Sequence, residues 1–268
     1  MKDITILTSD RITNIAYRLS ASLLYSLEHL KIITCLYLGF LTKIKMPEIE
    51  YDNFLKINLY KLDSEFRRIT VREQAKAKKE FIELIASNSS EHLVSTYSTV
   101  GTRSDADFML IQDSKTVETF HALSRDINRS LFGSYLQQSY SYLSIRRKSR
   151  YKHGGGVPKL KDDYKYMVVY PMTKTRPWYG LSQQERQDMM NDHFRVGKNY
   201  PMVKINTSYA FGLDDTEFVL SFEMDDPSDF TSLVMDLREV PAAQYTLTEI
   251  PIFTTIKMGI DQALDSIA

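Results

Sequence analysis

The chain reads as one structural unit written twice. Residues 101–127, GTRSDADFMLIQDSKTVETFHALSRDI, resemble residues 212–237, GLDDTEFVLSFEMDDPSDFTSLVMDL. Each copy begins with glycine and acidic turn residues, continues as an alternating strand, and after an acidic break becomes a helix with apolar residues at helical spacing. The similarity predicts two equivalent halves. The alternative is a coincidental likeness between two α+β stretches.

Further elements extend both copies outward. Paired segments are expected as opening strands (54–60 and 166–170), amphipathic helices (71–87 and 182–192), strands before the glycine (93–100 and 203–211) and closing strands (140–145 and 252–258). Ser182 and Glu185 form a capping box that starts the second of these helices. Each half is then a β-α-β-β-α-β unit. The predicted fold class is α+β, with two tandem ferredoxin-like (βαββαβ) units forming a dimeric α+β barrel within one chain.

The expected domains are an N-terminal extension (1–45), an N-terminal half (46–145), a basic, glycine-containing linker (146–164) and a C-terminal half (165–268). The apolar run at 32–41 is too short to cross a bilayer as a helix, and no clear signal peptide precedes it. We expect a helical or poorly ordered extension. A membrane-associating helix and a true start at Met46 are the alternatives.

The linker carries a run of basic residues before three glycines and Pro158, which do not support a regular element. Its first part contains Arg146, Arg147 and Arg150. Such a run is either a solvated face or an anion clamp for carboxylates or phosphates.

Composition excludes several classes of function. Lys plus Arg and Asp plus Glu both total 34, which argues against a nucleic-acid-binding protein. The single cysteine, Cys35, excludes an intrachain disulfide and a Cys-only metal site, and favours a reducing, cytoplasmic location.

The stretch from Tyr166 to His193 concentrates reactive side chains. The other histidines have no partner at metal-ligand spacing, so a zinc site is not expected. If His193 binds a metal, it does so as the sole protein ligand, which is how haem iron is commonly held. The alternative is that His193, placed at a helix end, only complements the helix dipole.

Tyr170 and Lys174 stand four residues apart after an apolar strand. Pro171 lacks a backbone N–H, so the strand is predicted to stop or bulge there and to leave Tyr170 at its end. The alternative is a core phenol beside a solvated lysine.

An ordered series of motifs resembles the chlorite dismutase and coproheme decarboxylase superfamily. The series is YPMTKTRPWYGLS from Tyr170, a helix, His193, G-x-x-Y from Gly197, and GLDDTEF from Gly212. The match spans about residues 52–258 and is densest from 166 to 253. The resemblance implies the duplicated barrel, a haem b or iron coproporphyrin cofactor in the C-terminal half, and a homopentamer.

The resemblance also implies roles for particular residues. His193 matches the proximal iron ligand, Tyr170 the tyrosine that is oxidised to a radical and attacks a propionate, and Lys174 its associated lysine. This pattern points toward the decarboxylase branch. The remaining expected cofactor-binding residues are Met172, Trp178, Arg146, Arg147, Arg150 and Tyr140, the arginines as candidates for the propionates.

Two positions depart from the family pattern. The distal position holds Ile205, where chlorite-decomposing members have arginine and the best-known decarboxylases glutamine; Lys204 and Asn206 are alternative equivalents. The acid that orients the proximal imidazole is matched by Ala242, with Glu239 nearby. Isoleucine does not hold an anion such as chlorite, and an imidazole without its carboxylate is a weaker electron donor.

The leading expectation is a peroxide-dependent decarboxylase of iron coproporphyrin, with a porphyrin and peroxide or another small oxidant as partners, no nucleic acid and no membrane span. Chlorite dismutation is the runner-up. A non-enzymatic haem carrier or sensor with an apolar distal pocket, and a fold that holds no haem, are further alternatives.

Overall fold

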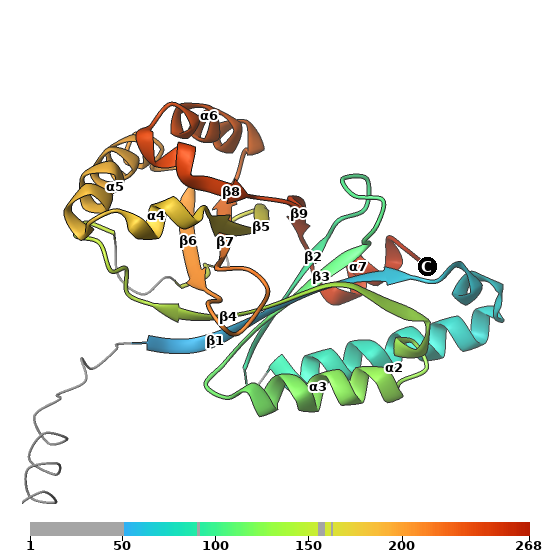
Figure 1. The fold of residues 1–268 in the computed structure, drawn as a ribbon. Coiled ribbons are helices and arrows are strands. Elements are labelled where there is room, and N and C mark those ends of the chain that lie inside the picture. The colour runs from blue at the N-terminus through green and yellow to red at the C-terminus, as the bar shows by residue number, and fades with distance from the viewer. Residues whose placement is uncertain (1–50, 90–91, 155–158, 162) are drawn as a thin grey trace, which may run out of the picture. The chain divides into compact units, whose positions relative to one another are not determined.

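The computed structural model describes residues 51–89, 92–154, 159–161 and 163–268 (Figure 1). The expectations for residues 1–45 and for a start at Met46 lie outside these residues. The N-terminal half comprises β1 (Tyr51–Leu62), η1 (Ser64–Arg68), α2 (Val71–Ser89), β2 (Leu93–Ser98), β3 (Phe108–Ser114), α3 (Val117–Arg129), η2 (Gly133–Tyr135) and β4 (Leu136–Arg147). The C-terminal half comprises β5 (Tyr166–Lys174), α4 (Arg176–Gly180), α5 (Gln183–Gly197), β6 (Lys204–Tyr209), β7 (Phe218–Met224), α6 (Pro227–Arg238), η3 (Pro241–Tyr245), β8 (Thr246–Thr248), β9 (Phe253–Lys257) and α7 (Ile260–Asp265).

The strands confirm the predicted barrel. The sheet order is β7-β6-β4-β1-β3-β2-β9-β5-β8, and β7 also pairs with β5, so the strands other than β8 form a closed ring. Within each half the four main strands follow the same spatial order, β4-β1-β3-β2 and β9-β5-β7-β6. The two halves join at β2–β9 and β4–β6, so the second strand of each half meets the last strand of the other.

Three apolar cores follow from this arrangement. One fills the barrel interior between the two sheets and includes Ile57, Met109 and Val169, all fully buried. A second lies between the N-terminal sheet and α2 and α3, which cover its outer face (Figure 1). The third lies over the outer face of the C-terminal sheet, on the side that carries α5 and α6.

The last helix returns to the first half. Ala263 and Leu264 of α7 are fully buried and belong to the core of the N-terminal half. Lys78 Nζ on α2 donates a hydrogen bond to the backbone oxygen of Ala268, and Arg67 Nε donates one to that of Ile267. Residues that follow the second ferredoxin-like unit therefore complete the core of the first.

The two glycine-initiated turns are equivalent. Gly101 and Gly212 have φ of 81° and 71°, the left-handed region that residues with a side chain rarely adopt. The similarity that marked the repeat in the sequence therefore reflects a shared backbone conformation.

Three sequence expectations need correction. Strand β5 does not stop at Pro171 but continues to Lys174, so Tyr170 is an interior strand residue. Pro171 is tolerated because β5 pairs with β9 only through Val169 and with β8 only from Thr173.

Helix α5 does not end near His193 but runs to Gly197, so His193 has helical geometry. Strand β4 extends through Arg147, so Arg146 and Arg147 are strand residues that point to opposite faces. No helix within the described part of the chain is both long and apolar enough to span a bilayer.

Candidate functional site

The outer face of the C-terminal sheet carries three rows of side chains fixed by strand register. Tyr170 on β5 lies opposite Leu220 on β7, which lies opposite Thr207 on β6. Neighbouring rows are Val168, Phe222 and Ile205, and Met172, Phe218 and Tyr209. Apart from the three hydroxyls, all of these side chains are apolar.

Helix α5 covers this face without packing tightly against it. It buries none of its side chains, whereas α2 buries Ala77, Phe81 and Ile85 in the other half. On the sheet below, Ile205 remains 39% exposed. The N-terminal half is therefore closed by a packed helix, while the equivalent face of the C-terminal half is loosely covered and able to admit a flat apolar ligand.

The imidazole of His193 is directed toward the sheet. A Cβ added at Gly197 would lie 3.5 Å from Cδ1 of Ile205, so this side of α5 faces β6. His193 lies four residues earlier, on the same side of the helix. Burial, and secondly the positive charge of Lys174, lower the pKa of His193 to about 4. The imidazole is therefore neutral at pH 7, with an electron pair available to a metal.

Tyr170 lies beneath the apolar cover of α6. Its ring stacks on Phe222 with centroids 5.6 Å apart and is close to Phe230 of α6. Burial raises the pKa of Tyr170, so its phenol stays protonated at neutral pH. Its hydroxyl makes no hydrogen bond to any residue that the structure describes. It is thus a neutral phenol in an apolar setting.

Lys174, four residues further along β5, is held by neutral groups. Its Nζ donates hydrogen bonds to the backbone oxygen of Ala242 at 3.0 Å and to Oγ1 of Thr246 at 3.2 Å, and lies 5.1 Å from the ring centroid of Trp178. Burial lowers the pKa of Lys174 to about 8. The amine is therefore mostly protonated at pH 7, without a carboxylate partner among the described residues.

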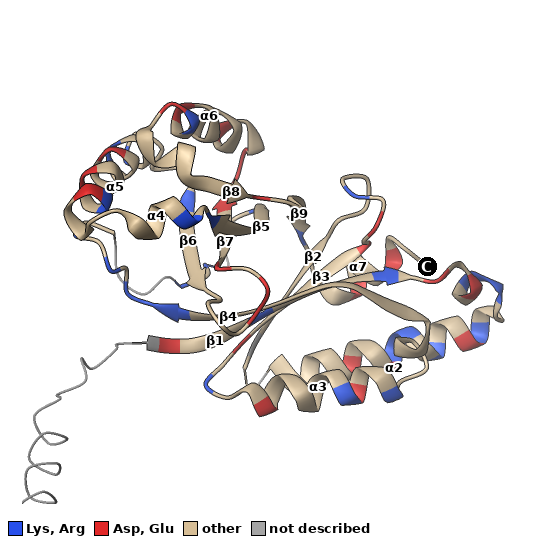
Figure 2. Ribbon diagram, viewed as in Figure 1, with Lys and Arg blue, Asp and Glu red and all other residues tan. Residues whose placement is uncertain are grey.

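Arginines lie at the β4 end of this face (Figure 2). The guanidinium carbon of Arg147 lies 5.4 Å from the ring centroid of Tyr209. Its Nε is buried and has no hydrogen-bond partner among the described residues. The charges of Arg147 and Arg150 act to lower the pKa of Tyr209, against the larger effect of burial, so both arginines are near it. A carboxylate at this edge would satisfy the unpaired donor.

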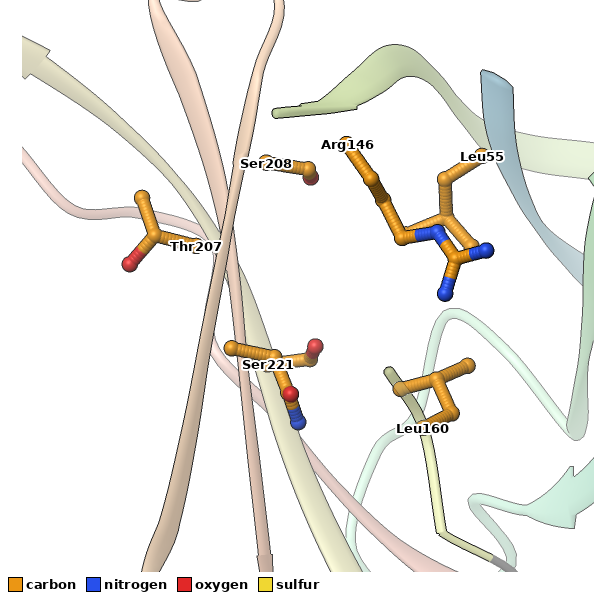
Figure 3. A pocket seen from close by; sticks show the side chains of 7 residues that line it. Leu55, Arg146, Leu160, Thr207, Ser208 and Ser221 are labelled. Atoms are coloured by element: carbon orange, nitrogen blue, oxygen red, sulfur yellow. The ribbon is translucent and has the colours of Figure 1, made fainter. Parts of the chain in front are cut away.

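Two of the predicted cofactor-binding residues are not brought to this face. Arg146 points into the barrel, where its guanidinium pairs with Asp113 at 2.6 Å and Asp52 at 3.1 Å. Figure 3 shows it directed into a small cavity, of about 10 Å³, on the side of β6 away from Thr207. Tyr140 packs against the same interior and donates to Asp105 Oδ2 at 2.5 Å. Both side chains are committed to partners of the N-terminal half.

The two departures noted in the sequence are visible in the structure. Ile205 lies on the outer face and Asn206 in the barrel, where Asn206 Nδ2 donates to Glu223. Ala242 is buried and supplies only its backbone oxygen, to Lys174. The imidazole of His193 has no hydrogen-bond partner among the residues described, so no carboxylate orients it.

Sequence reasoning missed an ion pair between Arg238, at the end of α6, and Glu249, just after β8. Both charges act on the pKa values of Tyr170 and Lys174. Nothing in the sequence links residues from separate elements in this way. Reasoning from the sequence also left out His153, which lines a cavity of about 200 Å³ on the flank of α5 with Phe194 and Lys198.

The donor set suits a single-ligand metal centre better than a metal held by several side chains. No three His, Cys, Asp or Glu side chains gather anywhere in the described ranges. One neutral imidazole faces an apolar, loosely covered sheet with basic side chains at its edge. These features define a dimeric α+β barrel whose C-terminal half carries a site suited to an iron porphyrin with carboxylate substituents.

Comparison with known proteins agrees with this class. The chlorite dismutase family model matches residues 74–258, and the chain belongs to this family. The chain is 28% identical over 172 residues to a coproheme decarboxylase of Mycolicibacterium smegmatis, a match that covers 63% of this chain and 74% of that protein.

Solved structures share the fold. The chlorite dismutase of Candidatus Nitrospira defluvii, in complex with imidazole, superposes with a TM-score of 0.75 at 21% identity, over 81% of this chain and 96% of that one. A haem-binding protein of Thermus thermophilus superposes with a TM-score of 0.72 at 22% identity, over 82% of this chain and 96% of that one.

Proposed function

We propose that the chain binds an iron porphyrin between α5 and the outer face of the C-terminal sheet, and that it oxidatively decarboxylates iron coproporphyrin with peroxide. The observation that carries the binding site is the loose cover of α5 over an apolar face. The similarity to a coproheme decarboxylase supports the choice of substrate. When bound, the iron porphyrin supplies the oxidising equivalents that peroxide delivers.

The chain's own residues would hold and orient the substrate. His193 Nε2 or Nδ1 offers a neutral electron pair to the iron. Arg147, with its unpaired Nε, and Arg150 bind carboxylates at the edge of the site. Met172 and Trp178 supply apolar contacts, and α5 with α6 restricts the entry of water.

Tyr170 would carry the redox step. Its phenol gives up one electron and its hydroxyl proton, and then regains a hydrogen atom from the propionate side chain. Overall, each propionate and one peroxide, with one proton, yield a vinyl group, one carbon dioxide and two waters. Lys174 is placed to donate a hydrogen bond to the reacting carboxylate, because its protonated amine is otherwise bonded only to neutral oxygens.

The test is to mix the purified protein with iron coproporphyrin and peroxide and to determine the mass of the porphyrin. Stepwise loss of carboxyl groups is expected. Binding of the porphyrin without such loss would contradict the decarboxylase assignment and leave binding intact.

A haem carrier or sensor is the second candidate, favoured by the apolar sheet face around Ile205. In that case the protein retains intact haem, has only weak peroxidase activity, and loses no carboxyl groups. Chlorite dismutation is disfavoured, because Ile205 has no charge to hold chlorite. Oxygen release on addition of chlorite distinguishes it.

As part of the same proposal, the chain forms a homopentamer in the cytoplasm. The support is limited to the family resemblance, the single cysteine, and exposed apolar side chains such as Met235, Leu247 and Ile250. Light scattering during size-exclusion chromatography measures the oligomer size.

A further inference from the structure

Thr207 is a free hydroxyl on an otherwise apolar surface. Its side chain leaves β6 on the opposite side from the small barrel cavity, toward the face covered by α5 (Figure 3). Its Oγ1 makes no hydrogen bond to any described residue, and its nearest cross-strand neighbours are apolar. Tyr209, two residues further along β6, differs because Ser149 hydrogen-bonds its hydroxyl.

The connection between α5 and β6 places Thr207 opposite His193. Strands β5 and β6 both pair antiparallel with β7, so they are parallel and α5 is their crossover helix, running back over the sheet. Gly197 lies over Ile205. One helical turn back from Gly197, about 6 Å, leads to His193. Two residues forward along the strand from Ile205, about 6.6 Å, lead to Thr207.

We propose that Thr207 is the hydrogen-bond donor to a small oxygen ligand, such as peroxide, on the sheet side of the bound iron porphyrin. This inference rests on the proposed porphyrin site. The imidazole of His193 approaches from the helix side, so the opposite side faces β6. Ile205 supplies no donor there, and Thr207 supplies one.

Tyr170 is the other hydroxyl without a hydrogen-bond partner on this face. It lies across two strand spacings from Thr207, roughly 10 Å away. The two hydroxyls therefore serve different places: Thr207 above the centre of the site and Tyr170 toward its rim. One hydroxyl hydrogen bond is expected to change the rate of reaction with peroxide by roughly three- to tenfold.

The test uses carbon monoxide bound to the reduced iron porphyrin as a probe of hydrogen bonding. A donor near the bound CO lowers its stretching frequency, which infrared spectroscopy measures. Thr207→Val removes the hydroxyl and keeps the shape, so the frequency is expected to rise. Thr207→Ser is expected to keep the wild-type frequency, and Tyr170→Phe is the control for the other hydroxyl.

An unchanged frequency in Thr207→Val, or a rise in Tyr170→Phe instead, overturns the assignment of Thr207 while porphyrin binding stands. Absorption titration of the wild type with iron coproporphyrin and with haem b comes first. If neither binds, the proposed function fails, and the role of Thr207 fails with it.

Discussion

Asp107 and Glu217 make the same contact in the two halves of the molecule. Asp107 Oδ2 accepts the backbone N–H of Leu62, the last residue of β1, at 2.9 Å. Glu217 Oε2 accepts that of Lys174, the last residue of β5, at 2.8 Å. Each carboxylate thus ties the turn after its glycine to the end of the first strand of its half. Only in the C-terminal half does the tied residue belong to the proposed reactive site.

The equivalence predicts a separable effect on binding. Glu217→Gln weakens the charge-assisted hydrogen bonds to Lys174 and to the Tyr179 hydroxyl, and is expected to lower the free energy of unfolding by about 1–3 kcal/mol. It should also weaken porphyrin binding, because it loosens Lys174. Asp107→Asn is the matched control: chemical denaturation should show a similar loss of stability, and porphyrin titration no change.

His193→Ala is expected to abolish the absorption spectrum of an imidazole-ligated iron porphyrin. His121→Ala, in the exposed part of α3, should leave the spectrum unchanged. A wild-type spectrum in His193→Ala would show that the iron has another ligand or that no iron is bound through the chain.

The lowered pKa of His193, about 4, predicts its behaviour in acid. Because an unfolded histidine has a pKa near 6.5, the unfolded chain binds more protons between these values, and stability should fall as the pH drops from about 6.5 to about 4. His193→Gln removes this part of the slope. NMR titration of the porphyrin-free protein locates the pKa directly, and a value near 6.5 would contradict the prediction.

Tyr170→Phe is expected to retain porphyrin binding and to lose decarboxylation, since phenylalanine keeps the packing on Phe222 but has no hydroxyl hydrogen to transfer. Tyr166→Phe lies on the same strand and face and should retain activity. The measurement is the mass of the porphyrin after peroxide treatment. Full activity in Tyr170→Phe would exclude the tyrosine from the redox step.

The return of α7 predicts a stability effect far from the site. Leu264 is fully buried in the core of the N-terminal half, so Leu264→Ala should destabilise by about 2–5 kcal/mol. Leu247, 66% exposed, gives the control: Leu247→Ala should change stability by less than about 0.5 kcal/mol. Equal effects of the two changes would show that α7 does not complete this core.

The sequence was sufficient for the architecture because the repeat and its periodicity are local signals. The glycine turns, the alternating strands and the capping box at Ser182 all appear as expected, and they determine which elements form. The continuation of β5 through Pro171 was missed, because it depends on where β9 leaves and β8 joins the neighbouring edge.

The site was only partly accessible from the sequence. Tyr170, Lys174 and His193 come from one stretch, and the structure places them around one face. Which arginine faces the site was not predictable: Arg146 and Arg147 are adjacent, but alternation sends one into the barrel and the other to the outer face. The pairing of Arg238 with Glu249 is tertiary and leaves no local pattern.

The path of α7 means that the duplication is not modular. A gene cut within the linker would yield a first fragment whose hydrophobic interior lacks the plug contributed by Ala263, Leu264 and Ile267. The second fragment would carry those residues as an unprotected apolar tail. Only co-expression of both fragments, and their reassociation along the two sheet seams, should restore a soluble fold.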